Sequence, residues 1–127
     1  MIGGFMNCGT PPGLVEALLA RDDIKDLTVI SNDHGIAGHG ISKLVSARKI
    51  RKAISNHLGL NPETGVQMNE GFMDVTVMPQ GTLSERSRCG GSGLGGVLTP
   101  AGVGTVVEEG KQKIELDGKT YLLERPL

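Results

Sequence analysis

Apolar residues recur along the chain with helical and strand periods in alternation. Leucine and valine positions between residues 14 and 19 follow the Pro11-Pro12 pair at helical spacing and predict a helix over 11–20. Runs rich in β-branched residues predict strands at 26–31, 49–57 and 73–79. One or two helical turns are expected over 41–47, and Asn61 is a candidate cap for a short helix that begins at Pro62. The alternation predicts an α/β fold with an open, largely parallel sheet flanked by helices.

The two ends of the chain also carry strand patterns. Met1-Ile2 reads as the last residues of a buried strand, since two residues cannot hold a place in a sheet by themselves. Near the other end, Asp117-Gly118 stands between two β-compatible arms within residues 111–127 and predicts an exposed C-terminal β-hairpin. Residues 1–127 are expected to form a single domain.

Three loops are expected beyond the carboxyl ends of the predicted strands, where ligands bind in parallel sheets. They are residues 3–10, residues 32–40 and the segment from Gln80 onward. Gly3-Gly4 precedes a helix start, so the first loop either directs backbone N–H groups at an anion or carbonyl, or is a tight connection with no ligand. Its glycines do not continue into a full dinucleotide fingerprint, which disfavours a Rossmann cofactor site.

Composition narrows the picture further. Phe5, Phe72 and Tyr121 are the only aromatic residues of the Phe, Tyr and Trp type, so the core is expected to be aliphatic. Thirteen basic and fourteen acidic residues nearly cancel, which disfavours nucleic acid and anionic lipid as partners. Two cysteines, and no apolar run of membrane-spanning length, favour a reducing cytoplasm and no disulfide framework. Nine of the 20 glycines lie between Gly81 and Gly110, which predicts a shaped loop region there.

Other polar residues have weaker claims to a site. Asp33, His34 and His39 lie close in sequence, but no further ligand at metal spacing accompanies them, so a metal site is not expected. Cys8 is either a reactive thiol near a helix start or a small residue packed under the loop. The basic residues within 48–52 could meet phosphates or an acidic partner, although a solvated strand edge is the simpler interpretation.

Two separated blocks of this sequence resemble one known family. The stretch GGFMNCGTP, at 3–11, is similar to the signature of the α half of family I coenzyme A transferases, which include acetate and acetoacetate enzymes. The block PQGTLSERSRCGGSGLGGVLTPAGVGT, at 79–105, resembles the same subunits nearly residue for residue. Ser31-Asn32, NPETG at 61–65 and LDGKTYLLERPL at 116–127 fit the acetate or acetoacetate type as well. The resemblance therefore covers essentially the whole chain.

The resemblance implies site residues on this chain. Asn32 and Gln80 are expected to line the acyl pocket, and the remaining expected contacts to the thioester are Gly3, Gly4, Phe5 and Gly81. Gln80 follows a predicted strand end and could donate an N–H to a developing oxyanion, although a helix-capping or solvated amide is the alternative. No metal and no cofactor is implied, because coenzyme A thioester is a substrate.

The resemblance also implies that the nucleophile belongs to another chain. In the family, a glutamate of a Ser-Glu-Asn-Gly motif on the β subunit attacks the acyl-CoA and becomes a glutamyl-CoA thioester. That motif does not occur here, and Glu16, Glu85 and the Glu108-Glu109 pair are expected to be solvated charges. We therefore expect a cytoplasmic, hetero-oligomeric α subunit whose partners are a β subunit, a short-chain acyl-CoA and a carboxylate.

Family α subunits extend beyond both ends of this chain, with a helix and a full first strand before the Gly-Gly-Phe block and further elements after Leu127. The fold is therefore expected to be incomplete, and open strand edges would favour self-association of the isolated chain. Two alternatives stay open at this point. One is a catalytically silent truncated chain that acts only in assembly or ligand binding, and the other is a sugar-phosphate-binding domain of related fold.

Overall fold

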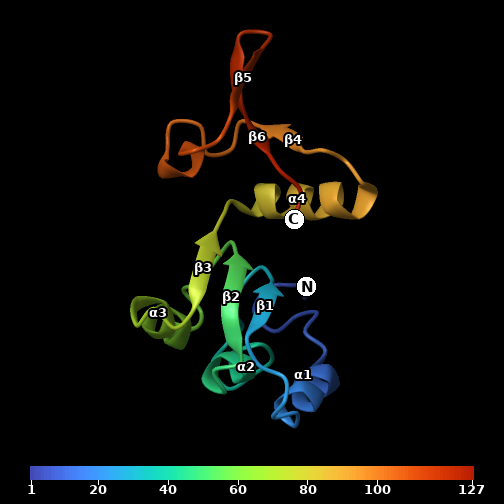
Figure 1. The fold of residues 1–127 in the computed structure, drawn as a ribbon, viewed down its shortest axis with the longest axis vertical. Coiled ribbons are helices and arrows are strands. Elements are labelled where there is room, and N and C mark those ends of the chain that lie inside the picture. The colour runs from blue at the N-terminus through green and yellow to red at the C-terminus, as the bar shows by residue number, and fades with distance from the viewer. The chain divides into compact units, whose positions relative to one another are not determined.

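The computed structural model describes residues 1–127, which divide into two compact units, Met1–Val77 and Met78–Leu127. The first unit contains a parallel sheet with helices, and the second contains the longest helix and an antiparallel sheet (Figure 1). These elements confirm the predicted α/β fold. The single domain expected over residues 1–127 stays a prediction.

The sheet of the first unit has three strands in the order β1-β2-β3, which are β1 (Leu27–Ile30), β2 (Ile50–Ser55) and β3 (Asp74–Val77). Both pairings are parallel, so the three strands end at the same edge of the sheet (Figure 1). The structure confirms all three predicted strands, and each lies within its predicted range. Of the predicted loops, residues 3–10 and 32–40 therefore lie at this edge, where a parallel sheet binds ligands.

Helices connect these strands, as the sequence predicts. They are α1 (Pro12–Leu19), α2 (Ser42–Ser46) and α3 (Pro62–Asn69). Proline occupies the first helical position of α1 and of α3, where a missing N–H costs nothing. The Asn61 side chain accepts a hydrogen bond from the Glu63 N–H at 3.1 Å, which confirms Asn61 as the cap of α3.

The core of the first unit is aliphatic, as the near absence of aromatic residues predicts. Leu44 and Val45 of α2 pack with Ile50 and Ala53 of β2, and all four are fully buried. Phe72 is partly buried against this cluster, and the guanidinium groups of two arginines lie over its ring. Because α2 has only five residues, this burial and not intrinsic helix propensity accounts for its stability.

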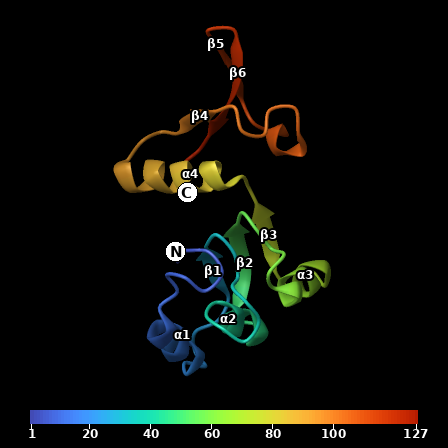
Figure 2. The same ribbon diagram turned by 180° about the vertical axis from the view of Figure 1, so that it is seen from behind.

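Ile2 pairs in parallel with Ser31 beside β1, and its N–H donates to the Ile30 carbonyl at 2.9 Å. The N-terminus accordingly lies beside β1 in both views (Figures 1 and 2). This pairing agrees with the strand character predicted for Met1-Ile2. An apolar cavity of about 280 Å³ lies in the same region, and its lining includes Leu14 and Leu18 of α1 and Leu27 and Val29 of β1.

The second unit begins with α4 (Gln80–Ser92) and continues through β4 (Val97–Thr99) and a single 3₁₀ turn, η1 (Val106–Glu108). It ends with β5 (Lys113–Leu116) and β6 (Lys119–Glu124), which pair antiparallel. Asp117 and Gly118 between them have φ of 50° and 70°, the left-handed conformation that a two-residue hairpin turn requires. The predicted hairpin is confirmed.

Two expectations for this second unit are wrong in part. The glycine-rich window is not all loop, because α4 continues through Gly90 and Gly91 to Ser92. A Cβ on Gly90 would stand 2.5 Å from the Leu127 carbonyl oxygen, so this helix needs glycine where the Leu127 backbone packs on it. The hairpin is also not simply exposed, since β6 pairs with β4 on its other side and Leu122 is fully buried.

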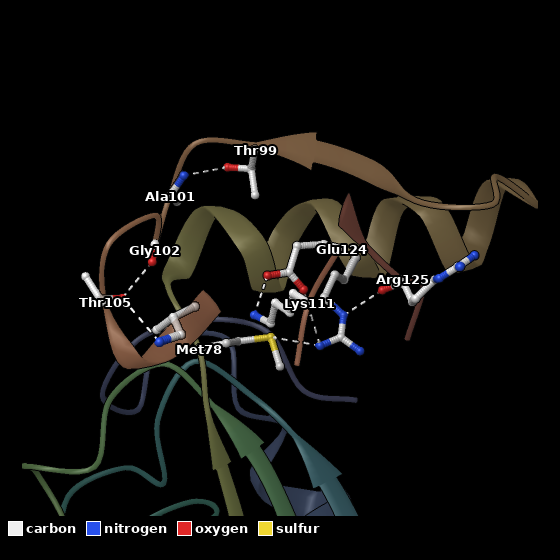
Figure 3. Close-up of polar contacts among 10 residues, drawn as sticks. Met78, Thr99, Ala101, Gly102, Thr105, Lys111, Glu124 and Arg125 are labelled. Atoms are coloured by element: carbon white, nitrogen blue, oxygen red, sulfur yellow. Dashed lines mark hydrogen bonds and ion pairs between the residues drawn. The ribbon is translucent and has the colours of Figure 1, made fainter. Parts of the chain in front are cut away.

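A buried carboxylate lies within the second unit. Glu124 is 2% exposed, and its oxygens face the Lys111 ammonium at 2.5 Å and the Arg86 guanidinium at 4.0 Å (Figure 3). Arg86 also donates to the Arg125 carbonyl at 2.6 Å. Removal of either cation would leave charge uncompensated in the interior, which typically costs several kcal/mol. The ion pairs therefore join β6 to α4 and to the loop before β5.

No helix in the structure has both the length and the apolar character that a membrane crossing demands.

Candidate functional site

Three loops of the first unit meet at the carboxyl edge of its sheet. They are residues 3–10, residues 32–40 after β1, and residues 56–61 after β2, and we call them the three-loop edge. The N–H groups of Asn56 and His57 both donate to the Asn32 carbonyl at 3.1 Å. The rings of Phe5 and His57 meet edge to face with centroids 5.7 Å apart. The structure thus brings four of the six predicted site residues, Gly3, Gly4, Phe5 and Asn32, to one set of contacting loops.

The Gly3-Gly4-Phe5 segment is a tight turn. Gly4 has φ of 99°, and a Cβ there would stand 1.6 Å from the Cys8 carbonyl oxygen, so only glycine fits. At Gly3 an added Cβ would meet nothing within 4 Å, so packing inside the chain does not account for that glycine. Phe5 is 48% exposed at the tip of the turn. The turn therefore exposes an aromatic ring and a backbone segment that a ligand or another chain can approach closely.

Asp33 joins the first loop to the second. Its carboxylate is 2% exposed and accepts hydrogen bonds from the Met6 N–H at 2.6 Å and the Gly35 N–H at 2.7 Å. The Asn7 side chain makes a second link, because its oxygen accepts from the Ile36 N–H at 3.3 Å. Nowhere in the chain do three or more His, Cys, Asp or Glu side chains gather as metal ligands would. Asp33 therefore serves the loop backbone.

His34 faces the interior. It is 1% exposed, and its Nδ1 hydrogen-bonds the Thr64 hydroxyl of α3 at 2.9 Å. Burial lowers the pKa of His34, while the neighbouring Asp33 carboxylate opposes that change, so the ring is neutral at pH 7. Asn61 donates to the His34 carbonyl at 3.4 Å. His34 thus ties the second loop to the start of α3.

Three buried polar atoms at this edge have no hydrogen-bond partner within the chain. They are His34 Nε2, Asn56 Oδ1 and His57 Nδ1. Buried polar atoms are almost always paired in native proteins, so such a concentration marks a place where the chain is not self-sufficient. The sequence reasoning did not single out Asn56 or His57. Their position directly after a strand end is the signal that could have found them.

The other two predicted residues, Gln80 and Gly81, form the first turn of α4 in the second unit. Gln80 is exposed, and its Nε2 donates to the Ser84 hydroxyl at 3.4 Å. A Cβ on Gly81 would meet nothing within 4 Å. Helix N-termini attract negative charge, so the placement suits a group that contacts an oxyanion. That Gln80 and Gly81 share a pocket with Asn32 and Phe5 stays a prediction.

Three of the four glutamate positions considered in the sequence hold ion pairs. Glu16 pairs with Lys43 at 2.5 Å, Glu85 with Arg88 at 2.8 Å and Glu108 with Lys113 at 2.7 Å. For Glu108, the hydrogen bond from Lys113 and that from the Gly104 N–H lower the pKa of the carboxyl. These glutamates have the environment of charged surface groups.

The basic residues of 48–52 contact their own chain. Arg48 pairs with Glu70 at 3.2 Å, Arg51 with Asp26 at 3.7 Å and Lys52 with Asp74 at 3.6 Å. The interpretation of the group as a solvated edge is wrong for Lys49, which is 9% exposed and donates to the carbonyls of Arg21 and Ile24. The interpretation of Cys8 as a small residue packed under the loop is also wrong. Cys8 is exposed and Cys89 is buried, and both are free thiols.

Comparison with solved structures supports the same architecture. The chain matches an acyl-CoA transferase of Escherichia coli O157:H7, in its thioester complex with CoA, with a TM-score of 0.77 and 22% identity over 98% of this chain and 28% of that one. A variant of the decarboxylase AibA/AibB matches with a TM-score of 0.74 and 21% identity, over 98% of this chain and 51% of that one. At such identities the likeness establishes the fold alone, and one of these two proteins is a decarboxylase.

Comparison of sequences is more specific. The pattern of the family described as coenzyme A transferase matches residues 1–127. The acetate CoA-transferase subunit alpha of Escherichia coli K12 is 61% identical over all of this chain and 57% of its own length. The acetoacetyl-CoA:acetate/butyrate CoA transferase alpha subunit of Clostridium acetobutylicum is 52% identical over all of this chain and 58% of its own length. The chain thus spans somewhat more than half of these relatives, and it belongs to the coenzyme A transferase family.

Proposed function

We propose that this chain is part of the α subunit of a CoA-transferase that moves coenzyme A between a short-chain acyl-CoA and a carboxylate such as acetate or acetoacetate. The observation that carries the proposal is the junction of the Gly-Gly-Phe turn with the Asn32 loop at the carboxyl edge of the sheet, in a chain of this family. The names of the two relatives support the choice of acids. Family membership favours this function over the sugar-phosphate alternative.

The reaction we propose conserves the thioester. A glutamate carboxylate attacks the acyl-CoA carbonyl, expels the CoA thiolate and forms a mixed anhydride. The thiolate then attacks the glutamyl carbonyl of the anhydride, which releases the donor acid and leaves a glutamyl-CoA thioester. The acceptor carboxylate then attacks the glutamyl-CoA thioester and expels the CoA thiolate, which attacks the acceptor carbonyl of the new anhydride, so the acceptor leaves as the new acyl-CoA and the glutamate is regenerated. No oxidant, reductant or cofactor enters the balance.

The division of labour follows from what this chain contains. Its sequence has no Ser-Glu-Asn-Gly motif, and Glu16, Glu85 and Glu108 are held in ion pairs. We therefore assign the nucleophile to a partner β subunit. Each step passes through a tetrahedral carbonyl adduct that carries an oxyanion, and fixed N–H donors stabilise such an adduct. This chain would supply those donors.

Within this chain, the proposal assigns the acyl pocket to Asn32 and Gln80. The thioester would lie against Gly3, Gly4 and Phe5 of the first loop, and Gly81 would admit it to the start of α4. The exposed Phe5 ring, and the open space that a Cβ on Gly3 or on Gly81 would meet, support that assignment. Two free cysteines support a cytoplasmic location.

The test is reconstitution of the complex. The protein that contains this chain is purified alone and after co-expression with its β subunit, and acetyl-CoA formation from acetate and butyryl-CoA is measured. We expect activity only in the complex. Borohydride added with acyl-CoA should reduce the glutamyl-CoA thioester and inactivate the β subunit. Turnover by the α subunit alone would contradict the proposal. A complex that does not react with acyl-CoA, and in which borohydride modifies no glutamate, would contradict it as well.

A further inference from the structure

Asp33 is a buried carboxylate that contacts the backbone of a loop distant in sequence. Its two oxygens are each bound to a backbone N–H, Oδ2 to Met6 at 2.6 Å and Oδ1 to Gly35 at 2.7 Å. Hydrogen bonds to an ionised acceptor are shorter and stronger than those between neutral groups. Met6 follows Phe5 directly, so Asp33 acts on the residue next to the exposed aromatic ring.

The loop that Asp33 holds does not have a relaxed backbone. Gly4, Met6 and Gly9 have φ of 99°, 61° and 82°, and Met6 thus adopts the left-handed conformation, which is uncommon for residues other than glycine. Such conformations persist where the surroundings fix them. The hydrogen bond from the Met6 N–H to Asp33 is made at the strained residue itself. The carboxylate therefore selects this form of the loop over more relaxed ones.

The second loop is fixed by the same group. Gly35 has φ of 70°, and a Cβ there would stand 2.8 Å from the Asn7 side-chain oxygen, so the two loops approach closely. Asp33 lies between them and is almost inaccessible to water. An amide in its place would keep the volume but would offer one acceptor oxygen where two N–H groups need one each.

We propose that Asp33 is a positioning residue of the transferase, which holds the Phe5 turn in its binding conformation by accepting the Met6 N–H. This inference rests on the proposed function. Asp33 does not itself touch the thioester. Without the Asp33 carboxylate, the Phe5 turn would no longer be held in one conformation. Acyl-CoA binding would then have to order the turn, so the Michaelis constant would rise while the rate of the bound complex changed little.

The experiment compares Asp33→Asn with Asp23→Asn in the α–β complex. Asp23 is a matched control because it is an aspartate of the same unit whose side chain is 64% exposed and pairs with Arg21 at the surface. For Asp33→Asn we expect kcat/KM for acyl-CoA to fall about tenfold, chiefly through KM, while kcat changes less than about twofold. Amide hydrogen exchange of the peptide that contains Met6 should become about tenfold faster, and Asp23→Asn should change neither quantity.

The exchange measurement keeps the inference separate from the function. If the wild-type complex lacks transferase activity, the proposed function fails. The structural claim that Asp33 holds the Phe5 turn is tested separately, and unchanged hydrogen exchange at Met6 in Asp33→Asn would overturn it. If the wild type is active, faster exchange with an unchanged KM would overturn the positioning role. A fall in kcat with KM unchanged would overturn it as well, because it would place Asp33 in the chemical step. Asp33→Glu, which retains the charge on a longer side chain, should restore exchange protection only in part.

Discussion

At the scale of single residues, His34 links proton binding to folding. Its ring is almost completely buried against Thr64 of α3, and burial lowers its pKa while the Asp33 carboxylate opposes the change. The unfolded chain therefore binds a proton at a higher pH than the folded chain does. Folding stability from this group is complete above the ordinary value of about 6.5 and is lost as the pH falls toward the folded pKa.

We predict that His34→Asn flattens this pH dependence. Asparagine can keep a hydrogen bond to Thr64 but cannot titrate, and His39 and His57 are common to both proteins. The wild type should lose stability between pH 7 and pH 5 by more than the variant does. Urea unfolding at a series of pH values measures the difference, and parallel profiles for the two proteins would contradict the assignment to His34.

The proposed role of Gln80 in the acyl pocket gives a second prediction at this scale. If its side chain donates to the oxyanion, Gln80→Ala should lower kcat of the α–β complex by roughly 100-fold, the usual loss for one such donor. The affinity for CoA should change far less, because the interaction forms only in the transition state. Gln112→Ala removes another exposed glutamine and serves as the control. An unaltered kcat in Gln80→Ala would exclude Gln80 from the pocket.

Prediction from sequence succeeded for residues that act locally. Asn61 caps the N–H two positions further on, and such a pattern is visible in five letters of sequence. Asp33 and His57 act across 27 and 52 residues, on Met6 and Phe5 respectively, and no local pattern encodes which backbone a fold will bring to them. The sequence drew attention to Asp33 only as a metal ligand that was weighed and not expected, and no local signal pointed to its bond with Met6.

At the scale of elements, α4 illustrates two uses of glycine in one helix. Gly90 and Gly91 are adjacent and both helical, but a Cβ on Gly90 would collide with the Leu127 carbonyl oxygen, whereas one on Gly91 would meet nothing within 4 Å. The former glycine permits packing, and the latter only loses backbone entropy on folding.

The pair gives a prediction with opposite signs. Gly91→Ala should stabilise the protein by about 0.5–1 kcal/mol, because alanine restricts the unfolded chain and suits a helix. Gly90→Ala should destabilise it by roughly 1–3 kcal/mol, as overpacking does. Urea unfolding followed by circular dichroism measures both changes. Equal effects of the two substitutions would mean that Leu127 does not pack on α4 as the structure shows.

The elements that sequence patterns missed are those whose cause lies elsewhere in the chain. Strands β1, β2 and β3 and the hairpin were predicted, since β-branched runs and the Asp117-Gly118 turn are local signals. Strand β4 has three residues in a glycine-rich window and exists because β6 offers it an edge. The last turn of α4 was missed for a similar reason, because glycines favour a loop locally and the need for Gly90 comes from Leu127, which packs on it.

At the scale of the whole molecule, the first unit has an open side. Strand β1 pairs with β2 along one edge, and along the other it has only the bridge from Ile2. The apolar cavity of about 280 Å³ lies there, and Leu14 at its rim is 66% exposed. Unpaired strand edges and uncovered apolar surface promote association.

We predict that the isolated chain self-associates through this side. Leu14→Lys should shift the association equilibrium toward the monomer, because a charged side chain beside the cavity opposes burial of this surface against a second copy. Val66→Lys is the control, since Val66 is an apolar side chain of α3 that is 53% exposed and does not line the cavity. Light scattering over a range of concentrations reports the outcome. An equal shift in both variants would assign association to general hydrophobicity, and no association of the wild type would refute the prediction.

The hydrogen bonds between the loops after β1 and β2 bear on which positions of the site can change in sequence without loss of the fold. The Asn32 carbonyl accepts hydrogen bonds from the backbone N–H groups of Asn56 and His57, and these two bonds do not depend on which side chains stand at 56 and 57. Because Asn56 Oδ1 and His57 Nδ1 have no partner in the chain, exchanging these side chains would sacrifice no internal hydrogen bond from those atoms. We predict that substitutions at 56 and 57 alter which acid the complex prefers while the scaffold stays intact, and a library randomised at these two positions and sorted for folded complexes would reveal that freedom.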